Sequence, residues 1–310
     1  MDEDRIEDVG DSGLREIPRR YLAAEDAARW VALLRPSVRL AAEAELWDAA
    51  DMQTAARLGG LPRLPDGTQW PTGPEGVRLA FVAAVDCGSL PAGALDVPLP
   101  AEGVLAFFAS TPLGEGPQGR YRAGETGPTP GRVVHVPADT PGSVRTAPPG
   151  VPVFPSVRLI AQREVVAPFP DHPRVRDAFA AHTWEGPYAH PLYEYDFLDE
   201  LAEYGHRFEH RVGGYPVCAG DVEYEAAAHR AGSTARVEPR TAGPRETARA
   251  LEWTLLAQFR CDPAEGVLGC DPLEEPAPPG DRRPGTLVWV IRREDLARGR
   301  FDDAVLLRQF

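Results

Sequence analysis

A four-residue element, Gly-Gly-x-Pro, occurs twice in this sequence and constrains its fold more than any other feature. The first copy spans residues 59–62 and the second spans residues 213–216. Two apolar runs follow each copy, at 79–86 and 103–110 in the first half and at 253–260 and 285–292 in the second. Apolar runs of this length without a helical period are typical of strands buried on both faces. The sequence therefore predicts a mainly β fold made of two related β units.

A second repeat supports this division. Pro-Ser-Val-Arg-Leu stands at 36–40 and again at 155–159, ahead of the Gly-Gly-x-Pro element in both halves. Each copy alternates apolar and polar residues, as a half-buried strand does. We expect a disordered acidic tail over residues 1–14 and a single body over residues 15–310. The body would hold two β units, at about 36–138 and 155–310.

Helices are expected outside the repeated parts. Apolar residues recur at helical spacing between Tyr21 and Leu34, which predicts an amphipathic N-terminal helix. An aromatic-rich insertion at 170–210 interrupts the second unit, and the density of its rings favours a local core over a ligand cage. The remaining expectations are helices at 174–182 and 195–206, a turn or short helix at 293–297, strands at 132–136 and 304–307, a short helix or irregular segment at 46–58, and a loop at 231–245. The fold class is mainly β (α+β), an internally duplicated sheet or roll.

All 33 basic residues are arginine, and neither lysine nor asparagine occurs in the sequence. Both missing residues have AT-rich codons, so the absence indicates a GC-rich genome. Without lysine the chain can carry no P-loop lysine, kinase-type lysine or Schiff base. Without asparagine it has no N-glycosylation acceptor.

Charge and hydropathy limit the partners. A net charge of −14 argues against nucleic acid, which recruits basic groups, and favours a protein or peptide of basic character. No apolar stretch of about 18 residues is present, and the acidic start is unlike a signal peptide, so we expect a cytoplasmic protein away from membranes. The four cysteines have no zinc-finger spacing, and no cofactor is predicted.

The glycine elements have a structural and a functional interpretation. Adjacent glycines make strained turns that pack one unit against the other, or they let a ligand approach the backbone. The turn residues are Gly59, Gly60, Pro62, Gly213, Gly214 and Pro216. Because the element occurs twice, the structural interpretation is favoured. A ligand groove between the two units would then be lined by Trp70, Tyr215, Gln258, Arg211 and Asp66.

Two further groups of residues are candidates for a catalytic site and a metal site. Asp66, Asp86, Asp221 and Glu252 stand near the repeated elements, and two converging carboxylates could act as general acid and base. An aspartate beside glycine more commonly caps a turn, and that interpretation is favoured. His206 and His210, with Cys218 nearby, have the spacing of a helical metal site, but the glycines that follow favour a turn-anchoring histidine.

Three motifs carry a resemblance to a known family. They are Gly59-Gly60-Leu61-Pro62 with Trp70-Pro71, the run His210 to Pro216, and Ile291 to Leu296 with Phe301. In this respect the chain resembles the YwqG-like family of bacterial proteins, a domain of unknown function. The resemblance implies a mainly β fold with pseudo-symmetric halves, and no activity or cofactor. Two glutamines of the family pattern are replaced by Ala84 and Ala219, whereas Gln258 is retained.

These observations together favour a non-catalytic binding or interaction protein with a groove between its two β units. The alternative is a hydrolase that uses converging carboxylates on a carbohydrate or a peptide.

Overall fold

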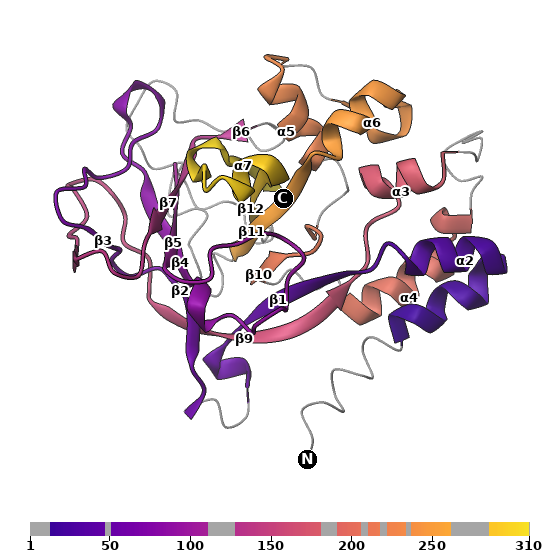
Figure 1. The fold of residues 1–310 in the computed structure, drawn as a ribbon, viewed down its shortest axis with the longest axis horizontal. Coiled ribbons are helices and arrows are strands. Elements are labelled where there is room, and N and C mark those ends of the chain that lie inside the picture. The colour runs from indigo at the N-terminus through magenta and orange to yellow at the C-terminus, as the bar shows by residue number, and fades with distance from the viewer. Residues whose placement is uncertain are drawn as a thin grey trace, which may run out of the picture.

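The computed structural model describes residues 13–46, 51–110, 128–180, 191–205, 210–217, 222–233, 237–261 and 285–309. Within them the fold is mainly β, dominated by one large antiparallel sheet (Figure 1). Its strands are β1 (Arg35–Ala42), β2 (Thr54–Leu58), β4 (Ala80–Asp86), β5 (Val104–Ala109), β6 (Pro128–Thr129), β7 (Gly131–Val136), β9 (Val157–Val166), β10 (His210–Gly213), β11 (Trp253–Cys261), β12 (Gly285–Arg292) and β13 (Val305–Gln309). A separate pair joins β3 (Arg63–Pro65) to β8 (Gly142–Val144).

The order across the large sheet is β6-β13-β12-β11-β10-β1-β9-β2-β4-β5-β7. Its two edge strands, β6 and β7, are separated in the chain by Pro130 alone. One end of this segment pairs with β13, where Thr129 lies opposite Leu306, and the other end pairs with β5. Because one continuous segment joins both edges, the sheet is nearly closed on itself.

The centre of the sheet contains both copies of the Pro-Ser-Val-Arg-Leu sequence. β1 and β9 pair over their length, with Arg35 opposite Val166 and Ala42 opposite Leu159. β1 then pairs with β10 from the second half of the chain, and β9 pairs with β2 from the first half. Each predicted unit therefore contributes its first strand to the other. The strand pairing is irregular between Thr54 and Ala56, between Phe81 and Ala83, and between Leu255 and Ala257.

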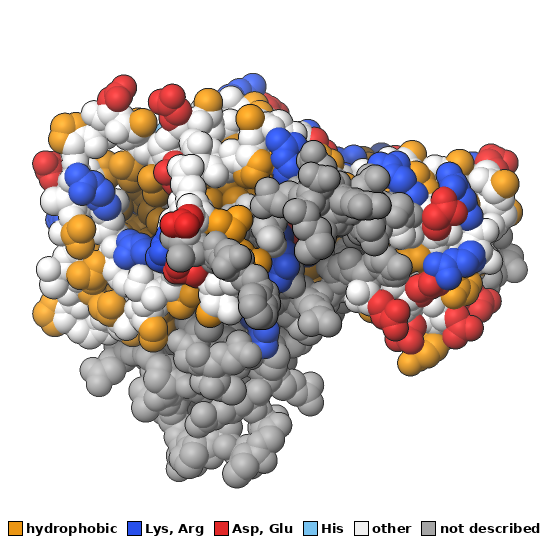
Figure 2. Space-filling view, turned by 90° about the horizontal axis from the view of Figure 1, so that it is seen from below, with side chains coloured by type: hydrophobic (Ala, Val, Ile, Leu, Met, Phe, Trp, Pro, Cys, Tyr) orange, Lys and Arg blue, Asp and Glu red, His pale blue; other side chains and the backbone are white. Residues whose placement is uncertain are grey.

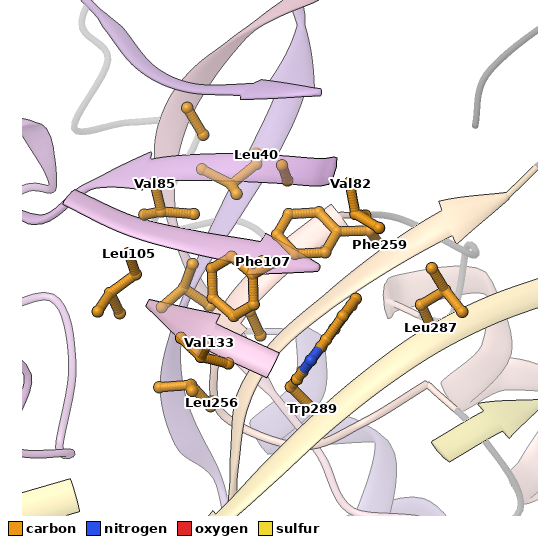
Figure 3. Close-up of a cluster of buried hydrophobic side chains, with 14 of the residues drawn as sticks. Leu40, Val82, Val85, Leu105, Phe107, Val133, Leu256, Phe259, Leu287 and Trp289 are labelled. Carbon is orange, nitrogen blue, oxygen red and sulfur yellow. The ribbon is translucent and has the colours of Figure 1, made fainter. Parts of the chain in front are cut away.

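Side chains fill the inside of the closed sheet. Phe107, Phe259 and Trp289 meet there edge to face, with ring centroids 5.2–5.7 Å apart (Figure 3). Aliphatic residues from both halves, such as Leu105 and Leu256, complete this cluster. Aromatic packing of this kind stabilises a core beyond the area it buries. The interior is a packed core, so a ligand site has to be sought outside it.

The helices are α2 (Ala24–Val31), α3 (Pro173–Ala178), α4 (Tyr195–Gly205), α5 (Val222–Arg230), α6 (Pro244–Ala250) and α7 (Arg293–Ala297). Helices α2, α3 and α4 gather at one end of the molecule, whereas α5 packs against β11 and β12 (Figure 1). Trp30, Phe179 and Phe197 belong to the core of that helical end, whereas Tyr195 of the aromatic insertion is exposed, and Trp184, Tyr188 and Phe208 lie outside the described residues. No helix among the described residues is long and apolar enough to cross a membrane.

Some expectations were wrong at the level of elements. The predicted N-terminal helix is shorter, Ala24–Val31, and a second helix over residues 13–21 precedes it, with Leu14 buried in the helical core. The segment 46–58 contains the strand β2 instead of a helix. Helix α6 begins within the predicted loop at 231–245, and helix α5 was not predicted.

Candidate functional site

The four glycines of the repeated elements have a structural role. All have a positive φ, between +56° and +70°, which side-chain-bearing residues rarely adopt. A Cβ atom on Gly60 would lie 3.3 Å from Cβ of Ser156, and one on Gly214 would lie 2.8 Å from Cβ of Ser37. Ser37 and Ser156 are the serines of the repeated pentapeptide. Each element therefore packs closely against one copy of that pentapeptide.

An arginine two residues before each glycine pair belongs to the same element. Arg57 Nη2 donates to the carbonyl of Leu61 at 2.7 Å, and Arg211 Nη1 donates to the carbonyl of Tyr215 at 3.4 Å. The repeat predicted from the sequence comprises only Gly-Gly-x-Pro, although the longer pattern Arg-x-Gly-Gly-x-Pro is present in both copies. Both arginines close the turn that the glycines make.

Three of the five predicted groove residues lie together. Arg211 faces Gln258 across β10 and β11, and the Gln258 side chain accepts a hydrogen bond from the Val217 amide at 2.8 Å. Tyr215 donates from its hydroxyl to the carbonyl of Leu33 at 2.5 Å. All three side chains are at most 2% exposed. They support the loop after β10 and are not open to a ligand. Ala84 holds the matching position opposite Arg57, so the first loop lacks this amide contact.

The other two groove residues lie elsewhere. The indole of Trp70 donates to the Leu79 carbonyl and packs edge to face on Phe108, outside the closed sheet. Asp66 accepts from Ser143 in the turn beside β3 and β8. On β9, Val157 lies opposite Leu58 and Glu164 lies opposite Ser37. These two positions of β9 are seven residues apart, a distance of about 23 Å along the strand. The structure does not bring Trp70 and Tyr215 together.

The candidate catalytic carboxylates occupy separate positions. Asp86 caps the turn after β4, accepting from the Gly88 amide and the Ser89 hydroxyl. Glu252 is exposed, and its backbone carbonyl accepts from the Arg293 amide. Asp221 lies outside the described residues. Among the described candidates no contact brings two carboxylates together.

His210 is a strand residue and does not lie on a helix. Its Nδ1 accepts the amide of Arg260 at 3.0 Å. Burial, followed by the charges of Arg260 and Arg39, lowers the pKa of His210 to about 4, so the ring is neutral at physiological pH. His206 and Cys218 lie outside the described residues, and within the described ranges no three potential ligands cluster for a metal.

The most elaborate polar site in the described residues surrounds Arg35, where β1 begins. Its guanidinium binds Asp96 through two hydrogen bonds, of 2.8 and 2.7 Å, and donates to the Gly214 carbonyl at 3.2 Å and to Thr254 at 3.3 Å. It also lies over the ring of Tyr215, 5.4 Å from the centroid. Arg35 is 6% exposed, so its charge is held inside the protein by one carboxylate and one aromatic ring.

The helical end joins this site through His172 and Arg174. The His172 ring meets the Tyr215 ring edge to face at 4.6 Å, and its Nε2 lies 3.2 Å from Glu223 Oε1 on α5. His172 Nδ1 accepts the amide of Arg174, which fixes the start of α3. From the other side, Arg293 at the start of α7 donates to the Asp96 carbonyl at 2.7 Å. We call the group Arg35, Asp96, Arg174, Tyr215 and Arg293 the arginine site.

The charges of the arginine site act on one another. Burial alone would raise the pKa of Asp96, but the hydrogen bonds and charge of Arg35, with the charge of Arg293, hold that pKa below its usual value. Burial raises the pKa of Tyr215 well above its ordinary value, although Arg35 and Arg174 act in the opposite direction. Asp96 is therefore ionised and Tyr215 neutral over the physiological range.

Sequence reasoning named Tyr215 and missed the other four residues of the arginine site. Arg35 and Asp96 are 61 positions apart, and Arg35 and Thr254 are 219 apart, so no spacing in the sequence connects them.

No curated protein matches the chain. A family model described as a domain of unknown function, DUF1963, matches residues 56–309, which include both Arg-x-Gly-Gly-x-Pro elements and every residue of the arginine site except Arg35. The chain therefore belongs to the DUF1963 family.

Proposed function

We propose that this protein is a non-catalytic interaction protein that binds a protein or peptide of basic character, and that it does so in the cytoplasm. The observation that carries the proposal is an acidic surface on α4 with an exposed aromatic ring at its start. We call this surface the α4 face; it comprises Glu194, Tyr195, Asp196, Asp199 and Glu203.

The α4 face is the outer side of a helix that is anchored on its inner side. Phe197 and Leu201 are buried, and Phe197 meets the ring of Trp30 at 5.5 Å. On the outer side Tyr195 is 77% exposed. An exposed aromatic ring keeps apolar surface in contact with water, which is unfavourable. A bound partner would bury that surface.

The charge on the α4 face is uncompensated. Helix α4 contains no basic residue, and within the described part of the chain only Glu200 has an arginine partner, Arg20. By contrast, the acids of α2, Glu25 and Asp26, both pair with Arg29. Acidic side chains accordingly gather at the helical end of the molecule (Figure 2). A basic partner would gain electrostatic attraction there without displacing internal ion pairs.

The hydrogen bonds of the described candidate carboxylates favour binding over catalysis. Asp66 and Asp86 accept local hydrogen bonds in turns, and the inside of the sheet is filled by aromatic rings. No described contact favours the hydrolase alternative. Because no described contact joins Trp70 to Tyr215, we locate the proposed binding surface on α4 rather than in a groove between the β units.

The proposal is tested by titrating the protein with a ten-residue arginine-rich peptide at about 50 mM salt, with a glutamine-for-arginine peptide as the neutral control. We expect saturable binding of the basic peptide that weakens at about 150 mM salt, because screening shortens the reach of surface charges. The triple variant D196N/D199N/E203Q should bind at least about fivefold more weakly.

A matched variant separates the α4 face from net charge. Asp51, Glu102 and Asp139 are also exposed, carry no ion pair within the described ranges and lie on the sheet body. The variant D51N/E102Q/D139N changes the net charge equally and should bind within about twofold of the wild type. Equal weakening by both triple variants, or binding no stronger than that of the neutral peptide, contradicts the proposal.

We infer further that the sheet consists of two related units and that the chain is YwqG-like within its family. The two Arg-x-Gly-Gly-x-Pro elements and their equivalent contacts with Ser37 and Ser156 support the two-unit interpretation. The motifs shared with YwqG-like proteins support the name.

A further inference from the structure

We propose that the outer edge of β8 is an interface between two copies of this chain, at which the β3–β8 pair of one copy joins that of the other across a two-fold axis. β3 lies at the end of the molecule opposite the helical end (Figure 1). The proposed interface is therefore separate from the α4 face, and the inference does not depend on the proposed basic partner.

The hydrogen bonds of the β3–β8 pair determine which backbone groups of β8 are open. The amides of Arg145 and Asp66 each donate to the opposite segment, at 2.9 and 3.2 Å, at the two ends of the pair. Bonded and non-bonded positions alternate in an antiparallel ladder, so the N–H and C=O groups of Gly142 and Val144 point away from β3. Among the described residues neither N–H has an acceptor. Val144 is also 61% exposed.

The outer edge of β3 is less able to accept another strand. Its outward positions are Arg63 and Pro65, which lie opposite Val144 and Gly142. Pro65 has no N–H group and cannot donate to an added strand. β8 has an N–H group and no charged side chain at either outward position, so only its short length protects it from pairing. In the large sheet, by contrast, one segment joins β6 to β7, which leaves that sheet nearly closed.

A second copy of the chain matches the β8 edge in register. When two β8 strands pair antiparallel about Ser143, Gly142 of each copy lies opposite Val144 of the other. Each of these pairs would exchange both of its backbone hydrogen bonds. Because Gly142 has no side chain, Val144 can cover it and reach Pro65, the cross-strand neighbour of Gly142 in the second copy. The pairing would remove the exposed valine of both copies from water.

The same register brings opposite charges together. Arg145 would lie opposite Pro141 of the second copy, and Pro141 is in turn paired with Asp66. Arg145 and Asp66 of the second copy would then be two strand spacings apart on the same face, about 10 Å, which the two side chains can span. Neither residue has an ion pair within the described ranges, and the two-fold axis would form this pair twice.

The place of the interface limits the repulsion between copies. A net charge of −14 opposes self-association, and the α4 face carries uncompensated acidic residues. Pairing through β8 would leave the α4 faces of the two copies at opposite ends of the dimer, because β3 and α4 lie at opposite ends of each copy (Figure 1). With so short a strand, we expect weak and reversible association.

The test is sedimentation equilibrium of the full chain at about 50 mM salt and at concentrations up to about 1 mM. We expect the average mass to rise with concentration from that of one chain toward that of two. V144P removes an outward N–H group from each copy and should weaken the association at least about tenfold. The control V153P changes a valine that is also exposed and whose amide donates no described hydrogen bond, so its association should stay within about twofold of the wild type.

Charge reversal tests the register. R145E and D66R each place like charges in line, so either variant alone should associate at least about fivefold more weakly than the wild type. An equal mixture of the two variants should associate more strongly than either alone, because the substituted side chains of the two copies attract each other. Mixing would not repair a folding defect in one variant.

Three results would overturn the proposal. The first is a wild type that stays monomeric, as it would if the β8 edge accepted only a strand from another protein. The second is a V144P variant that associates as strongly as V153P. The third is a mixture of R145E and D66R that associates no more strongly than the separate variants.

Discussion

Arginine supports the backbone from inside this protein. Arg57 and Arg211 each donate to the carbonyl four residues ahead, and Arg35 donates to the Gly214 carbonyl while it binds Asp96. Each uses the guanidinium fork to bind groups in different directions, which a lysine ammonium on a flexible stem does less well. In the sequence, the absence of lysine only excluded lysine-dependent reactions. In the structure, the basic residues that replace lysine also support the backbone.

His210 gives a prediction for the dependence of stability on pH. Its pKa is about 4 in the folded protein and ordinarily 6.5, so the unfolded chain binds the proton more readily between these values. Stability should fall by about 3 kcal/mol as the pH drops from 6.5 to 4 because of this residue alone. In H210N, whose amide oxygen can still accept the Arg260 amide, that part of the loss should vanish. Urea unfolding at several pH values measures it.

The exposed His229 on α5 provides the control for this experiment. H229N should follow the wild-type curve, since only the buried ring is predicted to contribute the difference. If H210N loses stability with acid as steeply as the wild type does, the assignment to His210 is incorrect.

At the scale of elements, the limits of a strand were predicted most accurately where the strand coincides with one uninterrupted apolar run. α7 has the predicted limits, and β4, β5, β11 and β12 agree with the predicted apolar runs to within one residue at each end. Helix α5 was missed because its charged residues do not gather on one face: Glu223 and Glu225 are two positions apart, and both are buried beside apolar residues. Helix α6 had a signal that was not used: Pro244 follows Gly243, and Glu246 accepts the Gly243 amide, as at a helix start.

The repeated turn gives the second prediction. A Cβ on Gly214 would lie 2.6 Å from Val166 Cγ2 and 2.8 Å from Ser37 Cβ, in addition to the strain of φ +70°. We expect G214A to reduce the free energy of unfolding by about 3 kcal/mol, from the left-handed conformation and overpacking combined. Gly67 has φ +80° and no atom within 4 Å of an added Cβ, so G67A should cost only about 1–2 kcal/mol. Equal costs in urea unfolding would mean that packing contributes nothing at Gly214.

At the scale of the whole molecule, closure of the sheet could not be predicted from the sequence. It depends on residues 128–136, a short segment that pairs with strands from both ends of the chain. Local patterns do not contain such long-range pairing. The arginine site has the same origin, since β1, α3, α7 and the segment around Asp96 meet only when the sheet closes around its core. The sequence did group Tyr215, Arg211 and Gln258 in one predicted groove; they lie together because β10, which leads into the second glycine element, pairs with β11.

Closure can be tested at Gly131 and Leu306. An added Cβ on Gly131 would lie 2.7 Å from Leu306 Cβ. G131A should therefore destabilise by about 1–3 kcal/mol, and L306A by about 2–5 kcal/mol. The double variant should cost less than the sum by at least about 0.5 kcal/mol, since truncation of Leu306 removes its Cδ2, which also lies 2.7 Å from the new methyl group, while the Cβ contact stays. Denaturant unfolding of the cycle measures the coupling. The pair G131A/L201A, with Leu201 in the helical core, should be additive; coupling of similar size there would count against closure at Gly131.

The central position of β1 has a consequence for where this family's fold begins. The matched region starts at residue 56, yet β1 occupies Arg35–Ala42 and separates β9 from β10. A chain cut at the family boundary would expose two unpaired strand edges in the middle of the sheet, which are ready templates for pairing with other chains. It would also lose the buried cation that holds Asp96. The boundary at which sequences remain recognisably alike is thus not a boundary of folding, and the segment before it is the central strand of the sheet.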